Sequence, residues 1–471
     1  MSINIKTSAY REDVLGTLDG VGLAERIASG EIMATEAVEA AIERALITNP
    51  NLNAIVTETF TRAREKAKKP IAGPFAGVPT FIKDTDDVKG VPIFFGSRAL
   101  SDKPSSRSSA FVRQYEALGL ISLGKSSLPE FGLTGTTEPL SKGPASNPWH
   151  LDYSTGGSSG GSAALVAAGV VPIAHGNDGG GSIRVPAACC GLVGLKPSRS
   201  RLKDMDGSRY MPINIVNQGV LTRTVRDTAA FYAAAEKIYR NAGLPEIGLV
   251  LRPGKARLRI GLFTEGPGGI PCESQPAGAA MEAGRVCEEL GHKVEKIPCP
   301  FRLEVLEDFG IYWGMLAFSI HHFGRMVLGK TVDKKKLEEL TLGLSRHYRK
   351  YILKTFIVIR RLQKFALYYE SIFKKYDILL SPVLSKAPFK LGYLGPDVPV
   401  DVHILRLAEL IPFTPVQNVS GAPAITLPMG RCREGLPIGV QFATAYGQDR
   451  RLIELSFEIE EARPWPMLFD Q

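Results

Sequence analysis

The sequence lacks the long apolar run that a membrane-spanning helix needs. No stretch of about 18 apolar residues occurs in the 471-residue chain, so no membrane span is predicted. The first residues, Met1 to Lys6, contain no basic stretch followed by an apolar one, and this indicates that no signal peptide is present. Together these absences lead us to expect a cytoplasmic protein.

Cysteine and histidine are too few and too scattered to suggest a metal site. The six cysteines show no C-x-x-C spacing, and the seven histidines show no H-E-x-x-H motif. Reduced, buried thiols are therefore expected. No metal and no cofactor is predicted.

Most of the chain has no net charge. The net charge of +9 comes from residues 330–375, which hold 13 Lys and Arg against 4 Asp and Glu. The rest of the chain holds 44 residues of each sign and is neutral. The basic character therefore marks one segment, and it does not predict a nucleic-acid-binding surface.

Apolar strands and helices alternate along the sequence, which is typical of an α/β fold with a sheet covered on both faces. Residues 303–375 interrupt this alternation with helices only, and we interpret them as an insertion over the functional edge of the sheet. One domain is predicted for residues 1–471. The expected strands are 78–82, 120–123, 170–174, 258–263, 377–380, 424–427 and 438–443, and the expected helices are 20–48 (with a break at Ser29-Gly30), 109–118, 162–168, 276–290 and 449–462.

Two serines 24 residues apart lie in the part of the chain that is richest in glycine. Ser158 lies within Gly156–Gly161, and Ser182 lies within Gly176–Arg184. Glycine tolerates positive φ and lets backbone N–H groups converge, so these loops suit an exposed nucleophile that faces an anion hole. Lys83, at the end of the apolar run 78–82, is expected to be a solvated strand end or, beside such loops, a neutral base.

Three other motifs compete with this interpretation. The G-x-S-x-G pattern around Ser158 needs a preceding strand, but residues 147–155 contain a proline and no apolar run. The S-x-x-K matches at Ser122 and Ser200 lack the S-D-N and K-T-G companions. The glycines of 191–198 do not form a phosphate loop, because Pro197 follows the lysine.

Several motifs in order resemble the amidase signature family. The resemblance covers nearly the whole chain, with its core at about 70–205 and its weakest part at 300–375. Within the family, Gly176–Ser182 and Thr136–Pro139 resemble bacterial amidases of the 6-aminohexanoate cyclic-dimer hydrolase type. The matching segments are 77–84, 124–132, 147–149, 156–162, 176–197, 418–424 and 435–441.

The resemblance implies a large mixed central sheet and a Ser-Ser-Lys triad. Ser182 would attack the amide carbonyl and form an acyl-enzyme, while Ser158 would relay its proton to Lys83. The base must be neutral at rest, which burial of a lysine favours. The resemblance also implies a cis peptide bond between Gly157 and Ser158, with Ser159 as the alternative relay.

The second glycine loop is expected to form the oxyanion hole from the backbone N–H groups of Gly179, Gly180, Gly181 and Ser182. Asp178 and Arg184, which flank this loop, are interpreted as a structural brace. His175 precedes Ser182 by seven residues and is expected to be a buried structural histidine.

The sequence departs from the family pattern at two positions. Tyr153 stands where the family often has Arg, and Gly179 stands where Thr is usual. The first change bears on the substrate entrance. The second is expected to loosen the oxyanion hole while keeping its backbone donor.

The predicted function is hydrolysis of a carboxylic amide, most simply a linear small-molecule amide rather than a peptide. One alternative is an amidotransferase A-type subunit that acts in a complex, although Leu128–Phe131 replaces the Met-Asp-Glu-Phe associated with it. The other is a non-enzymatic module that binds a membrane or a partner. The sequence leaves the oligomeric state open, with a homodimer as one option.

The insertion allows two interpretations. Its apolar residues recur at helical spacing and predict a core stripe with a solvated basic back. The alternative is that the basic residues of 346–375 contact anionic substrates or an acidic membrane surface. The predicted stripe is Tyr348, Ile352, Phe356, Ile359, Leu362, Ala366, Tyr369 and Phe373, and the candidate walls of the substrate pocket are Gly132, Tyr312, Trp313, Met315 and Phe318.

Overall fold

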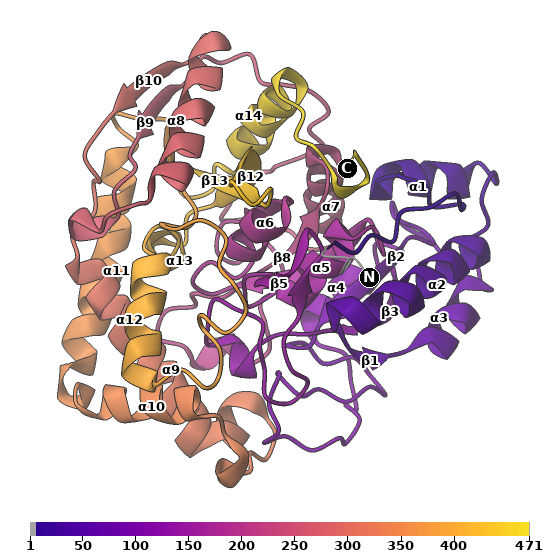
Figure 1. Cartoon of the computed structure of the whole chain (residues 1–471), viewed down its shortest axis with the longest axis horizontal. Helices are drawn as coiled ribbons and strands as arrows, with labels where there is room; N and C mark the ends of the chain where they lie inside the picture. The colour runs from indigo at the N-terminus through magenta and orange to yellow at the C-terminus, as the bar shows by residue number, and fades with distance from the viewer. Residues whose placement is uncertain (1–5, 471) are drawn as a thin grey trace.

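A mixed eight-stranded sheet forms the centre of the molecule (Figure 1). The computed structural model describes residues 6–470, except for the side chain of Arg209. The strand order is β10-β9-β11-β13-β12-β7-β8-β6; β9 pairs in parallel with β10 and β11, and the other neighbours are antiparallel. The strands are β6 (Ile173–Asp178), β7 (Val193–Lys196), β8 (Asn217–Thr222), β9 (Arg259–Leu262), β10 (Lys293–Lys296), β11 (Ile378–Pro382), β12 (Ala424–Arg431) and β13 (Pro437–Ala443).

Every residue of β6, β7, β8, β11 and β13 is buried. Successive side chains of a strand point to opposite faces, so complete burial means that both faces of the sheet are covered. The predicted α/β class, with helices on both faces of a mixed sheet, is therefore confirmed. The helices outside the insertion are α1 (Gly20–Ala28), α2 (Ala34–Leu52), α3 (Phe60–Ala67), α4 (Ala110–Glu116), α5 (Gly160–Ala167), α6 (Arg184–Cys190), α7 (Val225–Ile238), α8 (Ser274–Glu289), α12 (Val400–Leu410), α13 (Pro415–Ser420) and α14 (Asp449–Ala462).

A second, three-stranded sheet stands beside the first and holds Lys83. Its order is β1 (Ile55–Glu58), β3 (Ile121–Ser126) and β2 (Pro79–Lys83), while β4 (Ser146–Asn147) and β5 (His150–Ser154) form a separate pair. Side chains link β2 to β6: Thr80 Oγ1 donates to the carbonyl of Ile173 over 2.8 Å, and the Lys83 N–H donates to His175 Nδ1 over 3.2 Å. Lys83 therefore lies at the seam between the two sheets.

Residues 303–375, the predicted insertion, form helices, as predicted, and these lie along the left and lower sides of Figure 1. They are α9 (Glu304–Leu328), α10 (Glu339–Arg349) and α11 (Thr355–Ile372), with the short 3₁₀ turns η4 (Lys334–Lys336) and η5 (Ile352–Lys354). Helix α9 packs against both α10 and α11.

The predicted apolar stripe of the insertion is wrong at Ile352 and Phe356, although Tyr348 at its start is buried as predicted. Leu362 and Tyr369 are buried as expected, but Ile352 and Phe356 are 47% and 64% exposed. The reason is that η5 separates α10 from α11, so the helical phase does not run continuously from Tyr348 to Phe373. Phe356 therefore lies on the outer side of α11, where the sequence pattern had placed a core residue.

Candidate active site

Ser158 and Ser182 lie in two loops that meet at the ends of β2 and β6. Ser182 stands between the end of β6 and the start of α6, and Ser158 stands two residues before α5. The peptide bond between Gly157 and Ser158 is cis, in agreement with the sequence-based expectation. Only glycine fits at position 157, because a Cβ there would lie 2.2 Å from the carbonyl oxygen of Thr136.

Lys83 is fully buried and reaches the first serine loop. Its Nζ lies 2.8 Å from Ser158 Oγ, 2.9 Å from Ser159 Oγ and 2.6 Å from Asn177 Oδ1. Burial lowers the pKa of Lys83 from its usual 10.5 to about 7, and the carboxylates of Asp178 and Asp86 only partly oppose this. A substantial fraction of Lys83 is therefore neutral near pH 7.

His175 supports the backbone of Lys83. Its Nδ1 accepts the Lys83 N–H, and its Nε2 lies 2.8 Å from Gln218 Oε1, so Nε2 carries the ring proton. Gln218 in turn donates to Asp86 over 3.0 Å. Burial lowers the pKa of His175 to about 3, so the ring is neutral, and its contacts agree with the interpretation as a structural histidine.

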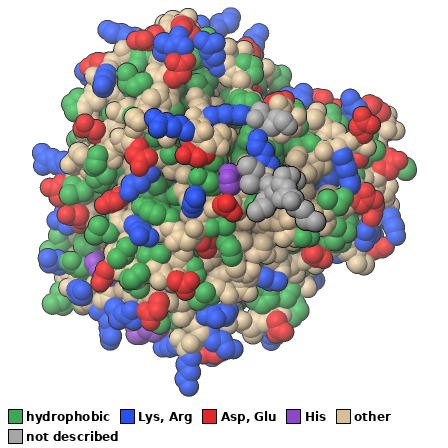
Figure 2. Space-filling model, viewed as in Figure 1, with side chains coloured by type: hydrophobic (Ala, Val, Ile, Leu, Met, Phe, Trp, Pro, Cys, Tyr) green, Lys and Arg blue, Asp and Glu red, His purple; other side chains and the backbone are tan. Residues whose placement is uncertain are grey.

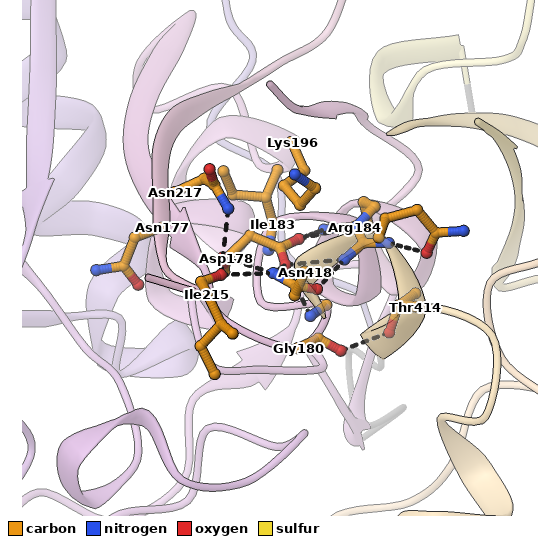
Figure 3. A network of polar contacts seen from close by, with 12 residues as sticks. Asn177, Asp178, Gly180, Ile183, Arg184, Lys196, Ile215, Asn217, Thr414 and Asn418 are labelled. Carbon is orange, nitrogen blue, oxygen red and sulfur yellow. Dashed lines mark hydrogen bonds and ion pairs between the residues drawn. The ribbon is translucent and has the colours of Figure 1, made fainter. Parts of the chain in front are cut away.

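Asp178 and Arg184 form the centre of a buried polar network (Figure 3). Arg184 Nε and Nη2 donate to the two carboxylate oxygens of Asp178 over 3.0 and 2.9 Å. Asn418 Nδ2 donates to the Asp178 carbonyl and carboxylate, and Thr414 Oγ1 donates to the Gly180 carbonyl over 2.5 Å. Burial alone would raise the pKa of Asp178, but the guanidinium of Arg184 holds it well below its usual range. The carboxylate of Asp178 therefore stays charged and holds the second glycine loop through its hydrogen bonds.

One of the four predicted oxyanion-hole donors is already engaged. The Gly181 N–H donates to Asp178 Oδ1 over 2.8 Å, so it points into the brace and away from an incoming carbonyl. Among the described residues, the N–H groups of Gly179, Gly180 and Ser182 donate to no protein acceptor. Three of the four predicted oxyanion-hole donors are therefore available to a ligand, and the Gly181 N–H is not.

An apolar cavity of about 150 Å³ opens beside Ser182. Helices α9, α10 and α12 supply most of its wall, and Gly180, Gly181 and Ser182 form its inner end. The aliphatic and aromatic side chains that line it are Leu133, Val185, Leu306, Phe309, Trp313, Leu340, Leu344, Ile404, Leu407 and Ile411. Such a wall suits a hydrocarbon chain.

A second cavity of about 160 Å³ lies on the Ser158 side of the site. Ser158, Asn177, Gly179 and Ser182 line its inner end, and Met315 lies in its wall. It shares nine residues, among them Thr85 and Asp206, with a polar vestibule of about 600 Å³. The site therefore has two arms that meet at Ser182.

The five predicted pocket residues are divided by the structure. Gly132 and Trp313 line both cavities, and Met315 lines the second. Tyr312 lies outside both: it is buried, and its hydroxyl bonds the backbone of Ile213. Phe318 also lies outside, against His322, Phe323 and Tyr348. The last two are packing residues because they face away from the cavities on α9.

Other lining residues were missed in the sequence. Asn177 lies inside the second glycine motif, where its amide could have been recognised as a lysine partner. The wall residues of α12, such as Leu407, carry no motif, and no helix had been predicted there. They reach the site only through tertiary packing.

The two departures from the expected pattern have different consequences. Tyr153 lies against His150, with ring centroids 4.8 Å apart, and lines neither cavity. At Gly179, a Cβ would lie 3.3 Å from Val216 and 3.5 Å from Trp313. A side chain at position 179 would therefore crowd Val216, while its Cβ would meet the indole of Trp313 at an ordinary van der Waals distance.

Comparison with known proteins finds amidases that are similar to this chain over nearly its full length. A family model described as Amidase matches residues 36–453. A Mycobacterium leprae protein named "Putative amidase AmiC" is 45% identical over 463 residues, which cover 98% of each chain. The 6-aminohexanoate-cyclic-dimer hydrolase of Paenarthrobacter ureafaciens is 33% identical, with 95% of each chain covered. The solved structure of 6-aminohexanoate cyclic dimer hydrolase complexed with substrate has a TM-score of 0.86 at 30% identity, over 96% of this chain and 98% of that chain.

Proposed function

Because this chain belongs to the amidase family, we propose that it hydrolyses a linear carboxylic amide through an acyl-enzyme on Ser182. The observation that carries the proposal is the buried Lys83, whose Nζ lies 2.8 Å from Ser158 Oγ and whose pKa is lowered to about 7. A neutral amine in this position can accept a proton from the serine pair.

The hydrogen bonds around Lys83 favour Ser158 over Ser159 as the relay. Asn177 Oδ1 can only accept, so it takes one N–H of a neutral Lys83. Ser159 Oγ donates its own proton to the Asn177 carbonyl over 3.2 Å, so it accepts the second N–H. The lone pair of Nζ is then left for the hydroxyl proton of Ser158.

The reaction follows from this arrangement. Ser182 Oγ bonds to the carbonyl carbon, its proton passes to Ser158, and the Ser158 proton passes to Lys83. The tetrahedral intermediate places its negative oxygen at the N–H groups of Gly179, Gly180 and Ser182. When the C–N bond breaks, the proton returns through Ser158 to the leaving amine. Water then attacks the acyl-Ser182 ester by the same proton route and releases the acid.

The positions of the two cavities support one orientation of the substrate. The amine leaves on the Ser158 side, because Ser158 delivers its proton, and this side is the second cavity and its polar vestibule. The acyl group then occupies the first cavity, which is lined mainly by aliphatic and aromatic side chains. The proposed substrate class is an amide with an apolar acyl chain.

Turnover of an acyl anilide tests the function directly. The purified chain is expected to release the aniline and, with hydroxylamine present, to form the hydroxamate of the same acyl group. Hydroxamate formation reports a transferable acyl group on the enzyme. If anilides, alkyl amides and primary amides were all left intact, the proposal would fail.

The pH dependence should follow the titration of Lys83. Since the neutral amine is the active form, kcat/KM is expected to rise through about pH 7, to level off above it, and to be about a hundredfold lower at pH 5. His175 does not account for this step, because its pKa is about 3. Measuring kcat/KM from pH 5 to 9 checks the expectation.

Glu338 provides the control for this profile. Burial raises its pKa to about 7 as well, and it lies at the N-terminus of α10, where its carboxylate accepts the Leu140 N–H. Glu338→Gln should keep the step near pH 7. A step that disappeared in this variant would assign the titration to Glu338 and count against a Lys83 base.

The acyl cavity should set chain-length preference. Leu407→Phe fills part of the cavity and is expected to lower kcat/KM for long-chain acyl anilides by about tenfold or more, with little effect on acetyl anilide. Leu405→Phe on the same helix is the matched control, since Leu405 is 60% exposed and lines no described cavity. An equal loss with short and long acyl groups would contradict the assignment of this cavity to the acyl chain.

A further inference from the structure

The segment that joins α10 to α11 is rich in exposed Lys and Arg residues. We call residues 346–368 the basic corner. They contain seven Lys and Arg and no Asp or Glu. In Figure 2, blue and green side chains adjoin one another along the lower left border, where Figure 1 places α10 and the start of α11. The corner thus combines positive charge with apolar surface.

Most of this charge is not neutralised within the fold. Arg346 pairs with Glu339 and Arg361 pairs with Asp308. The remaining five form no ion pair with any acidic residue that the structure describes, and all five are exposed: Arg349, Lys350, Lys354, Arg360 and Lys364. Their charges are therefore available to an external anionic surface.

The apolar side chains of the corner project into solvent. Leu353 is 95% exposed, and Phe356 and Ile357 are 64% and 56% exposed. None of the three lines a described cavity, so they form a protruding surface and not a groove. The guanidinium of Arg360 lies 4.3 Å from the ring centroid of Phe356, which keeps a cation directly beside an exposed aromatic ring.

From these observations we propose that the basic corner docks on an anionic lipid surface, with Leu353, Phe356 and Ile357 entering the headgroup boundary. Exposed Leu and Phe flanked by Lys and Arg are typical of segments that lie in the membrane interface. A protein partner is disfavoured because charged residues are depleted at the core of protein interfaces, and a flat partner would leave Leu353 without a pocket. None of the helices that the structure describes contains an apolar stretch that could span a bilayer.

Flotation with lipid vesicles tests this proposal. The full chain is expected to bind vesicles of equal parts phosphatidylcholine and phosphatidylglycerol at low salt, and to bind pure phosphatidylcholine far less. Combined Lys354→Gln, Arg360→Gln and Lys364→Gln should weaken anionic binding by about tenfold or more. High salt should reduce wild-type binding in the same direction.

The matched control removes the same number of exposed, unpaired cations elsewhere. Arg252→Gln, Lys255→Gln and Lys293→Gln combined should bind as wild type does, because these residues lie outside the insertion. Combined Leu353→Ser and Phe356→Ser should weaken binding without changing hydrolysis of a soluble amide, which shows that the variant is folded.

Three results would overturn the proposal. The first is equal binding to neutral and anionic vesicles, or binding to neither. The second is a loss in the matched control as large as the loss in the corner variant. The third is a dimer in solution that Leu353→Ser with Phe356→Ser converts to a monomer, since a second copy would then cover the corner.

Discussion

Replacing Ser182 by alanine is expected to lower kcat/KM by about 10⁶-fold, because no acyl-enzyme can form without its hydroxyl. The fold should be unchanged, since the substitution removes a single oxygen atom. Turnover of an anilide gives the rate, and a fluorophosphonate label that reacts with wild type should not react with the variant. Ser456→Ala, at a buried helix position in α14, is the control and should keep full labelling and turnover.

Alanine variants of Ser158 and Ser159 distinguish the proposed proton relay from the neighbouring serine. Ser158→Ala should lose several orders of magnitude, whereas Ser159→Ala should lose about tenfold, because Ser159 only accepts one of the Lys83 N–H groups. If Ser159→Ala were the more damaging of the two, the proposed proton route would be wrong.

Lys83→Met should lower kcat by about 10⁴-fold while leaving the protein folded, because it deletes the base and keeps an unbranched side chain that is one atom shorter. Its remaining activity should lack the step near pH 7. The melting temperature should change little: the variant leaves the partners of Nζ without a donor, but it also removes a group that is costly to charge in the interior.

A second buried lysine provides a contrasting control. Lys125 on β3 is 1% exposed, and its Nζ donates to the Asp84 carboxylate over 2.9 Å and to the Asp86 carbonyl over 2.7 Å. Lys125→Met strands the buried carboxylate of Asp84 and should destabilise the fold by about 3–5 kcal/mol, with turnover per folded molecule retained. Calorimetry with active-site titration distinguishes the two variants. Loss of catalysis in both, or in neither, would contradict a specific role for Lys83.

The core of the site could be predicted because its signals are local. Ser158 and Ser182 lie in glycine-rich segments, and the neighbouring glycines in the sequence indicate the unusual backbone conformation of these loops. Lys83 ends a fully buried strand. The engagement of the Gly181 N–H by Asp178 could not be predicted, since it depends on how Arg184 and Asn418 hold that carboxylate.

Elements that depend on distant packing were harder to predict. Strands β7 and β8 were not predicted from the hydrophobic pattern. Strand β7 is only four residues long, and β8 contains polar Asn and Gln within the core. The outward position of Phe356 depends on the 3₁₀ turn before α11, and the sequence carries no strong breaker there. Tyr312 and Phe318 share a helix with Trp313, yet only Trp313 faces the cavities.

Trp313 stands in the wall of both arms of the site, and its Nε1 donates to the Leu133 carbonyl over 3.1 Å. The indole ring of Trp313, held by this hydrogen bond, is thus part of the wall that separates the two cavities. On the proposed assignment of the acyl group to one cavity and the amine to the other, residues other than Trp313 can resize one cavity without changing the other, so the two preferences can evolve separately around the proposed nucleophile. Smaller residues at position 313 would join the cavities into a single chamber, open to branched or ring-shaped amides that neither cavity holds alone.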